Sequence, residues 1–247
     1  MRARALLILA VLTLAGCGQP AAPDPSATTS DSRFPKADRP VASIVSDRWS
    51  TEEARDRLNE ADEVMQRAGI MPGMTAADIG AGEGYYTTRL AQRVGAKGRV
   101  LAEDIVPAVR DKLAERATRE RLANVSVRLG EPDDPKLPAN SFDRIFMVHM
   151  YHEIEEPYAF LWNMRPALSK DGLVVVVDAN REPQNHGTPP NLLRCEFAAV
   201  GYSLVELEPM PSAGGYFATF RAVGPRPAPE DIVPCRMKRS VPTPAAS

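Results

Sequence analysis

Three alternating glycines after an acidic residue form the loop with the clearest chemical meaning in this 247-residue sequence, ADIGAGEGYY at residues 77–86. Glycine lets the backbone approach a ligand closely, and a helix beginning near Tyr85 would offer unpaired amides to an anion. The third glycine comes one residue too early for the dinucleotide pattern G-x-G-x-x-G, and Tyr85 stands in its place. The Gly-Lys-Ser/Thr of a phosphate loop is also absent from this stretch. The loop therefore predicts a ligand without a diphosphate.

A second group of chemically capable side chains lies in HMYHEIEEP, residues 149–157. His149, Tyr151, His152 and Glu153 gather two possible proton acceptors and a phenol, and histidine is well matched to proton transfer near neutral pH. Proton transfer and structural packing of the histidines at a strand end are both compatible with this group. The stretch lacks the H-E-x-x-H spacing and an evident third ligand, so no metal site is predicted.

The elements that must position these residues follow from the hydrophobic pattern, which alternates between strand and helix. Strands are expected at 74–80, 99–105, 125–131, 142–150 and 172–179, helices at 85–94, 107–120, 158–169 and 191–202, and two closing runs at 203–210 and 215–223. One further helix should precede them, capped by Ser50 and Glu53 and continuing to Gly69. This order predicts an α/β fold with a mostly parallel sheet and an antiparallel edge formed by the closing runs. Ligands of such sheets bind beyond the carboxyl ends of the strands, where the glycine loop falls.

Five segments in order resemble the class I S-adenosylmethionine-dependent methyltransferases. They are ADIGAGEGYYT, GRVLAEDIVP, NVSVRLGE, LPANSFDRIFMVHMYHEI and RPALSKDGLVVVVD, within residues 50–223. The resemblance implies a Rossmann-like, doubly wound, mostly parallel seven-stranded sheet with an antiparallel C-terminal hairpin. It also implies S-adenosyl-L-methionine as the cofactor and methyl transfer as the reaction.

The same resemblance assigns the cofactor-binding residues. Gly80, Gly82 and Gly84 would approach the methionine end of the cofactor, and Asp78 would lie near its amine. Asp104, at the end of the second strand, matches the acid that binds the ribose hydroxyls, although its neighbour Glu103 could take that role.

Two further positions complete the expected cofactor site. Glu131 matches the segment that offers an acid to the adenine amine, with Asp133 as its competitor. His149 is expected to form a wall of the cofactor pocket. The acceptor would then lie beside His152 and Glu153, which the resemblance makes the predicted catalytic residues. The segment NREPQNHGTPP at residues 180–190 is either a lid over the acceptor or an ordinary loop.

The first residues, MRARALLILAVLTLAGC, indicate an export signal. Arg2 and Arg4 precede an apolar run too short for a permanent membrane span, and small residues lead to Cys17. The stretch resembles a bacterial lipoprotein signal, which implies lipidation of Cys17 and a protein anchored in the cell envelope, facing the periplasm. We therefore expect a signal over residues 1–17, a disordered Pro-rich tether over 18–45, a methyltransferase domain over 46–223 and a Pro-rich tail over 224–247.

Composition narrows the possible partners. The net charge of −2 gives no electrostatic footprint for nucleic acid. A small molecule is the expected acceptor, and the sequence does not name it. Cys195 and Cys235 could pair in an oxidising compartment or stay as separate thiols, and oligomeric state is left open.

Export conflicts with a cofactor made in the cytoplasm. Three hypotheses remain: an envelope methyltransferase with access to exported cofactor, a binding module that kept the fold, or a cytoplasmic enzyme with a downstream start.

Overall fold

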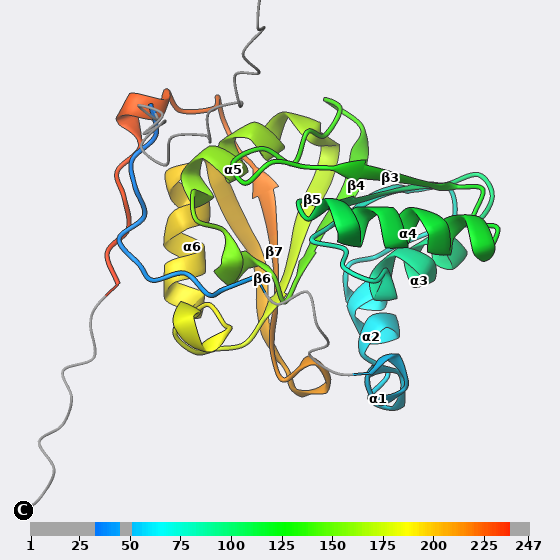
Figure 1. Ribbon diagram of the computed structural model, residues 1–247. Coiled ribbons are helices and arrows are strands. Elements are labelled where there is room, and N and C mark those ends of the chain that lie inside the picture. The colour runs from blue at the N-terminus through cyan, green and yellow to red at the C-terminus, as the bar shows by residue number, and fades with distance from the viewer. Residues whose placement is uncertain (1–32, 45–50, 238–247) are drawn as a thin grey trace, which may run out of the picture. The chain divides into compact units, whose positions relative to one another are not determined.

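The computed structural model describes residues 33–44 and 51–237 of the chain (Figure 1). The predicted signal, Cys17 and the first part of the tether lie outside these residues. Within the described ranges, no helix has both the length and the apolar character needed to cross a membrane.

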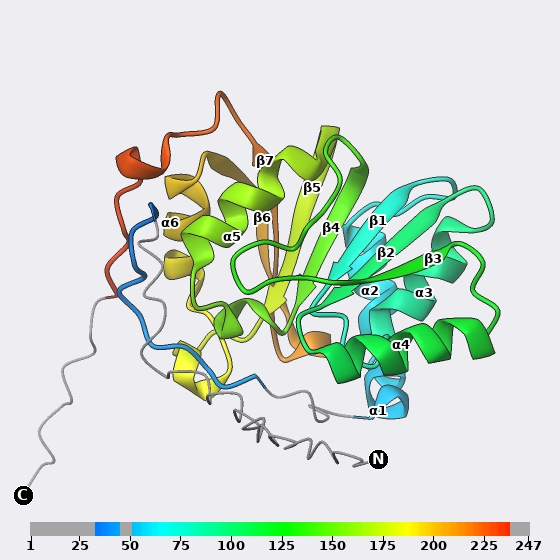
Figure 2. The same ribbon diagram turned by 45° about the horizontal axis from the view of Figure 1, so that its top comes forward.

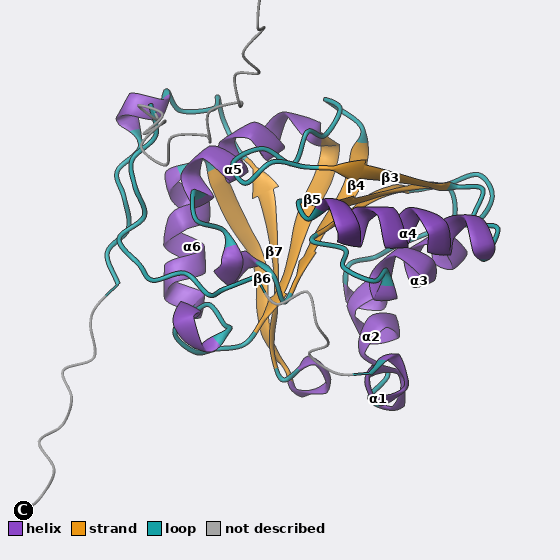
Figure 3. Ribbon diagram, in the orientation of Figure 1, coloured by secondary structure: helices purple, strands orange, loops and turns teal. Residues whose placement is uncertain are grey.

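Helices and strands follow one another in the order expected from the sequence (Figure 3). The helices are α1 (Glu52–Arg57), α2 (Glu60–Arg67), α3 (Tyr85–Val94), α4 (Pro107–Arg119), α5 (Pro157–Met164) and α6 (Pro190–Ala199). The strands are β1 (Thr75–Ile79), β2 (Arg99–Asp104), β3 (Val125–Leu129), β4 (Phe142–Val148), β5 (Leu168–Asp178), β6 (Tyr202–Met210) and β7 (Gly215–Ala222).

The strands of the described chain form a single sheet in the order β3-β2-β1-β4-β5-β7-β6. β1 to β5 pair in parallel, whereas β7 runs antiparallel to both β5 and β6. The predicted fold class, a Rossmann-like sheet with an antiparallel C-terminal hairpin, is confirmed. The parallel arrangement brings the ends of β1, β2, β4 and β5 to one edge of the sheet (Figure 2).

Helices bury both faces of this sheet. On one face, α2 and α3 pack over Val175 and Val177 of β5. On the other face, α5 and α6 pack over Val174 and Val176. All four valines are fully buried, which explains why β5 carries an unbroken apolar run instead of an alternating one.

The single helix predicted before β1 is wrong in one respect, because the chain forms two short helices there. Asn59 has a φ of 55°, the left-handed conformation that asparagine tolerates better than most residues, and it separates α1 from α2. Thr51 caps α1 by accepting a hydrogen bond from the amide of Ala54 at 3.3 Å. The predicted cap Ser50 lies outside the described residues.

Residues 33–44 belong to the folded unit and not to the tether that their composition predicts. The Arg39 side chain is 1% exposed and forms an ion pair with Glu196 of α6 at 2.9 Å. The amide of Ala42 donates to the carbonyl of His152 at 3.1 Å. These contacts hold residues 33–44 on the domain, although the segment contains few apolar residues.

The segment after β7 is also held by the fold up to residue 237, although its composition predicts a solvated tail. Cys195 of α6 forms a disulfide with Cys235, with Cα atoms 6.0 Å apart. The bridge closes a loop of 40 residues, which restricts the unfolded chain and stabilises the fold by about 4 kcal/mol in the chain-entropy account. Figure 1 shows this segment in red beside residues 33–44 in blue, and the backbones of Asp38 and Arg236 form an isolated parallel β-bridge.

Candidate active site

A cavity of about 230 Å³ lies at the carboxyl ends of the parallel strands. Its lining combines the glycine loop, the end of β2 and the segment after β4: Ile44, Gly80, Gly82, Glu103, Asp104, Ile105, Pro132, His149, Met150, Glu153, Ile154, Glu155 and Phe160. Three parts of the chain that the sequence marks separately therefore meet around one hollow. This is the place at which open α/β sheets bind their ligands.

Gly80 and Gly82 form the floor of this cavity with a left-handed backbone. Their φ angles are 64° and 55°, which side chains other than glycine adopt at a cost. A Cβ atom on Gly82 would have no heavy atom of the described residues within 4 Å, so this position faces open space within the described part of the chain. The loop thus leaves room for a ligand to approach its backbone closely.

Gly84 serves helix packing and does not line the cavity. A Cβ atom at this position would lie 2.4 Å from Leu113 of α4. The close approach of α3 and α4 therefore explains this glycine, and its predicted contact with the cofactor is not what the geometry requires.

Asp78 lies beneath the loop and outside the cavity lining. The residue is 3% exposed, and its carboxylate accepts a hydrogen bond from the Thr87 hydroxyl at 2.6 Å. Burial raises the pKa of Asp78 to about 6, although the Thr87 hydrogen bond opposes the rise. The residue holds the start of α3 against β1, and its contact with a cofactor amine stays a prediction.

The two acids at the end of β2 have different surroundings. Asp104 accepts hydrogen bonds from the amide of Gly82 at 3.0 Å and from the amide of Val106 at 2.9 Å. Both of its oxygens are therefore engaged in shaping the loop. Oε1 of Glu103, by contrast, is buried and has no hydrogen-bond partner among the residues that the structure describes.

Burial and the neighbouring Asp104 charge raise the pKa of Glu103 to about 8. A buried carboxyl oxygen without a partner is costly unless a ligand supplies a donor. Gly130 makes room for this side chain, since a Cβ atom there would overlap Oε1 of Glu103. Oε1 of Glu103 thus has an unused capacity to accept a hydrogen bond, whereas both oxygens of Asp104 are already engaged. Glu103 is 1% exposed, so its side chain has to move to meet a ligand.

Glu131 lies outside the cavity lining and is exposed. Lys136 forms an ion pair with it at 3.1 Å. Neither Glu131 nor Asp133 lines the cavity, whereas Pro132 between them does. The adenine contact of Glu131 stays a prediction that would need its side chain to turn.

His149 forms part of the cavity wall, as expected. Its backbone φ is 55°, and its amide donates to the carbonyl of Val177 at 2.8 Å. Nε2 lies 3.7 Å from the Glu60 carboxylate. Burial tends to raise the pKa of Glu60, but His149 and Arg55 outweigh it and lower this pKa to about 2. An ionised Glu60 therefore helps to hold the His149 ring in place through Nε2.

His152 and Asp178 form a buried pair between the ends of β4 and β5. Nδ1 of His152 lies 3.0 and 3.1 Å from the two Asp178 oxygens, and the side chains are 3% and 0% exposed. Asp178 also accepts from the Thr188 hydroxyl at 2.7 Å and the Ala179 amide at 2.8 Å. A carboxylate only accepts hydrogen bonds, so Nδ1 of His152 carries a proton, and in the neutral ring this tautomer leaves the lone pair on Nε2.

Tyr151 is not part of the site. Its side chain is fully buried on the far side of the turn, where the hydroxyl donates to Glu196 at 2.7 Å. Burial and the Glu196 charge raise its pKa well above the usual range. The phenol therefore belongs to the core.

His186 is a residue of this region that sequence reasoning missed. One ligand atom each of His152, Glu153 and His186 lies within 4.8 Å of the others. His186 comes from the loop 180–190 and has a φ of 57°. The only sequence signal was the position of His186 in the segment predicted as a lid. Its imidazole offers the third possible metal ligand, which the spacing within residues 149–157 does not provide.

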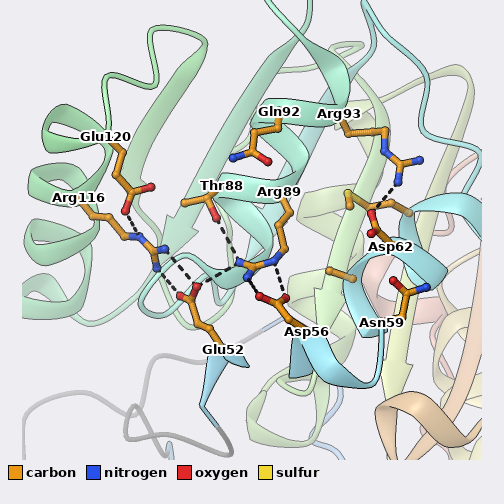
Figure 4. A pocket seen from close by; sticks show the side chains of 12 residues that line it. Glu52, Asp56, Asn59, Asp62, Thr88, Arg89, Gln92, Arg93, Arg116 and Glu120 are labelled. Carbon is orange, nitrogen blue, oxygen red and sulfur yellow. Dashed lines mark hydrogen bonds and ion pairs between the residues drawn. The ribbon is translucent and has the colours of Figure 1, made fainter. Parts of the chain in front are cut away.

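A larger cavity of about 700 Å³ lies between the N-terminal helices and the helices α3 and α4 (Figure 4). Its arginines are paired with acids: Arg89 lies 2.5 Å from Asp56, and Arg116 lies 2.5 Å from Glu52. Burial opposes ionisation of Glu52, yet the two arginines lower its pKa. These pairs dock α1 on the domain, and the glycine loop and the catalytic candidates lie elsewhere.

The chain is similar in sequence to known methyltransferases. Residues 77–176 match the family described as Methyltransferase domain. The chain is 48% identical over 73 residues to nocamycin O-methyltransferase of Saccharothrix syringae, and this alignment covers 29% of this chain and 26% of that protein. It is 29% identical over 124 residues to (S)-coclaurine N-methyltransferase of Thalictrum flavum subsp. glaucum, covering 48% and 34%. The chain thus spans about a quarter to a third of these two curated relatives.

Solved structures share the fold at low identity. A methyltransferase from Aquifex aeolicus superimposes with a TM-score of 0.59 at 23% identity, over 69% of this chain and 97% of that one. The [4+2]-cyclase SpnF gives a TM-score of 0.59 at 18% identity, over 77% and 89%. Together with the family match, the fold supports a class I S-adenosylmethionine-dependent methyltransferase domain with S-adenosylmethionine as its cofactor.

Proposed function

We propose that this protein transfers a methyl group from S-adenosylmethionine to a small-molecule acceptor while anchored in the cell envelope by a lipid on Cys17. The methyl-transfer part of this proposal rests on the cofactor cavity. There the backbone of Gly82 is open to a ligand, and Oε1 of Glu103 has no hydrogen-bond partner among the described residues. A close backbone approach and a carboxylate acceptor are what a nucleoside with a vicinal diol requires. The residues present therefore fit this cofactor.

The chain's own residues divide the binding of the cofactor among them. Glu103 accepts the ribose hydroxyls, and Asp104 holds the loop through the Gly82 and Val106 amides. Ile105 and Pro132 give the cavity apolar lining at the β2 and β3 ends. The bound cofactor supplies an activated methyl group, so orienting the acceptor accounts for much of the acceleration.

The acceptor end of the cavity is the side of Glu153, which lines it and stands next to His152 in the chain. Asp178 fixes the His152 ring, leaving Nε2 for an acceptor or for a group that orients one. Nocamycin and coclaurine methyltransferases are named for small molecules, and the net charge of −2 offers no footprint for nucleic acid. Both facts support a small-molecule acceptor.

The same features favour an enzyme over a binding module that merely kept the fold. The His152 ring is oriented by a fully buried carboxylate, which gives it a defined nitrogen for proton transfer or for orienting an acceptor, and this supports an enzyme. The fold alone leaves both open, since a cyclase shares it.

Replacing Gly82 with Val tests the cofactor site. We expect calorimetry to show S-adenosylmethionine and its demethylated product binding to the wild-type protein, and affinity at least about 10-fold weaker in Gly82→Val. The side chain would enter the open space above the loop and strain a backbone with φ of 55°.

Gly214→Val is the matched control, because its φ is 67° and its Cβ would also meet nothing within 4 Å, but it lies in the turn before β7. If both variants lost cofactor affinity equally, backbone strain alone would explain the loss, and the Gly82 position would have no specific role in binding. Absence of binding to the folded wild-type protein would favour the binding module for another ligand.

The envelope location has its own test. Cys17→Ala is expected to abolish acyl labelling and membrane association, because the lipid is the predicted anchor. The Cys195–Cys235 disulfide supports an oxidising compartment. A wild-type protein that carries no lipid and fractionates with cytosolic markers would overturn the proposed location while leaving methyl transfer untouched.

A further inference from the structure

Three side chains with metal-binding atoms converge beside the cofactor cavity. Ligand atoms of His152, Glu153 and His186 all lie within 4.8 Å of one another, and the two imidazole rings are 5.5 Å apart in an edge-to-face arrangement. They come from two segments more than 30 positions apart, the turn after β4 and the loop after β5. The fold therefore brings this group together, and no short sequence motif contains all three residues.

Asp178 gives this group a feature typical of metal-binding histidines. A histidine that binds a metal commonly donates its other ring N–H to a carboxylate, which fixes the ring and its tautomer. Nδ1 of His152 makes this contact with Asp178 at 3.0 Å, and Thr188 and the Ala179 amide hold the carboxylate in turn. Nε2 of His152 is then the atom that remains to bind a cation.

We propose that His152, Glu153 and His186 bind one divalent transition-metal ion, with zinc as the representative of its class. Two imidazoles and a carboxylate suit zinc and its neighbours, whereas magnesium and calcium prefer oxygen alone. Zinc bonds of about 2.0–2.2 Å place tetrahedral ligand atoms roughly 3.4 Å apart. Glu153 and His186 are only partly buried, so small rotations of these two side chains complete the set around the fixed His152.

The position of Glu153 gives the cation a role in the proposed reaction. Three protein ligands leave a fourth position open, as in catalytic zinc sites. Because Glu153 also lines the cofactor cavity, that position borders the space for the acceptor. The acceptor class is then a molecule with a hydroxyl or phenolic oxygen, which the cation orients and makes more acidic. This role rests on the proposed function, whereas the binding of the metal does not.

Metal analysis of the purified protein tests the site directly. The full chain is stripped with chelator, exposed to Zn²⁺ and dialysed, and bound zinc is counted by mass spectrometry, with affinity from competition titration. We expect one equivalent per chain for the wild type and at least about 100-fold weaker binding for His186→Ala and His152→Ala. Asp178→Asn should weaken binding by about 10- to 100-fold through the ring that it orients.

His149→Ala is the matched control, since it removes the third histidine of the chain but none of the proposed ligands. It should keep one equivalent of zinc. His186 is partly exposed on a loop, so its variant should keep the wild-type circular dichroism and thermal transition. Unchanged zinc binding in folded His186→Ala, or no tight zinc in the wild type, overturns the site.

Cofactor calorimetry separates this proposal from the proposed function. A protein that binds S-adenosylmethionine but no zinc refutes the metal site alone. A protein that binds zinc but no cofactor refutes methyl transfer and leaves the metal site standing.

Discussion

His152→Ala is expected to lower the rate of methyl transfer about 100-fold or more while changing cofactor affinity less than about 2-fold. His152 is buried and does not line the cofactor cavity, so its loss leaves the glycine loop and Glu103 in place. Its removal frees the Asp178 carboxylate and deprives the acceptor of the group that orients it. The effect should therefore appear in turnover and not in binding.

His149→Ala gives the opposite pattern and is the control for this variant. His149 lines the cofactor cavity and is held by Glu60, so its removal should weaken cofactor binding more than it slows a saturated reaction. The assay first identifies an acceptor by incubating the protein with labelled cofactor and envelope extract, then compares single-turnover rates. Unchanged methylation by folded His152→Ala would remove this residue from the mechanism.

Asp178→Asn tests the pair itself. An amide in place of the carboxylate can donate to Nδ1 and so favours the wrong tautomer of His152. A fall in turnover with KM for the cofactor unchanged would identify Asp178 as a positioning residue. A purely structural role would instead appear as a lower unfolding temperature with normal turnover in the folded fraction.

Periodicity was enough to predict the sheet. The alternating runs, the valines of β5 and the Pro/Gly turn before β7 each reflect local burial, and local burial leaves a pattern in the sequence. The break at Asn59 was missed because one left-handed residue interrupts a helix without changing its apolar spacing. Residues 33–44 were missed because Arg39 is held by a buried ion pair with Glu196, which is 157 positions away.

The residues of the site likewise separate into those that the sequence could predict and those that only the structure reveals. Motif order indicated the glycine loop and the acids after β2, but two neighbouring acids on one strand look alike until their partners are known. Only the geometry shows that the Gly82 and Val106 amides occupy Asp104 while an oxygen of Glu103 has no partner. His186 and Asp178 meet His152 through the topology of β4 and β5, which no local spacing records.

Glu103→Gln is expected to weaken cofactor binding at least about 10-fold at pH 8 and to remove its dependence on pH. In the wild type, burial and the charge of Asp104 raise the pKa of Glu103 to about 8, so the carboxyl is mostly protonated at pH 6. Ribose hydroxyls donate to the ionised form, so binding releases a proton. Affinity should rise by up to about 10-fold per pH unit below the pKa and level off above it.

The stability of the cofactor-free protein should change in the opposite direction. Glu103 has a folded pKa near 8 and a usual value of 4.5, so between these values the folded state binds more protons than the unfolded state. The free energy of unfolding should therefore fall as pH rises through this window. Asp78, with a pKa of about 6, adds to the fall at the acid end, so the range from pH 6.5 to 8 reports mainly on Glu103.

Urea unfolding and calorimetry across this range measure both trends on the same protein. Glu103→Gln should flatten each of them, because a neutral amide neither ionises nor needs a proton to be buried. Glu131→Gln is the matched control: its carboxylate is exposed and paired with Lys136, so both slopes should survive. If Asp104→Asn instead of Glu103→Gln abolishes the pH dependence of binding, the ribose contact belongs to Asp104. The Gly82 and Val106 amides would then have to release that side chain when the cofactor binds.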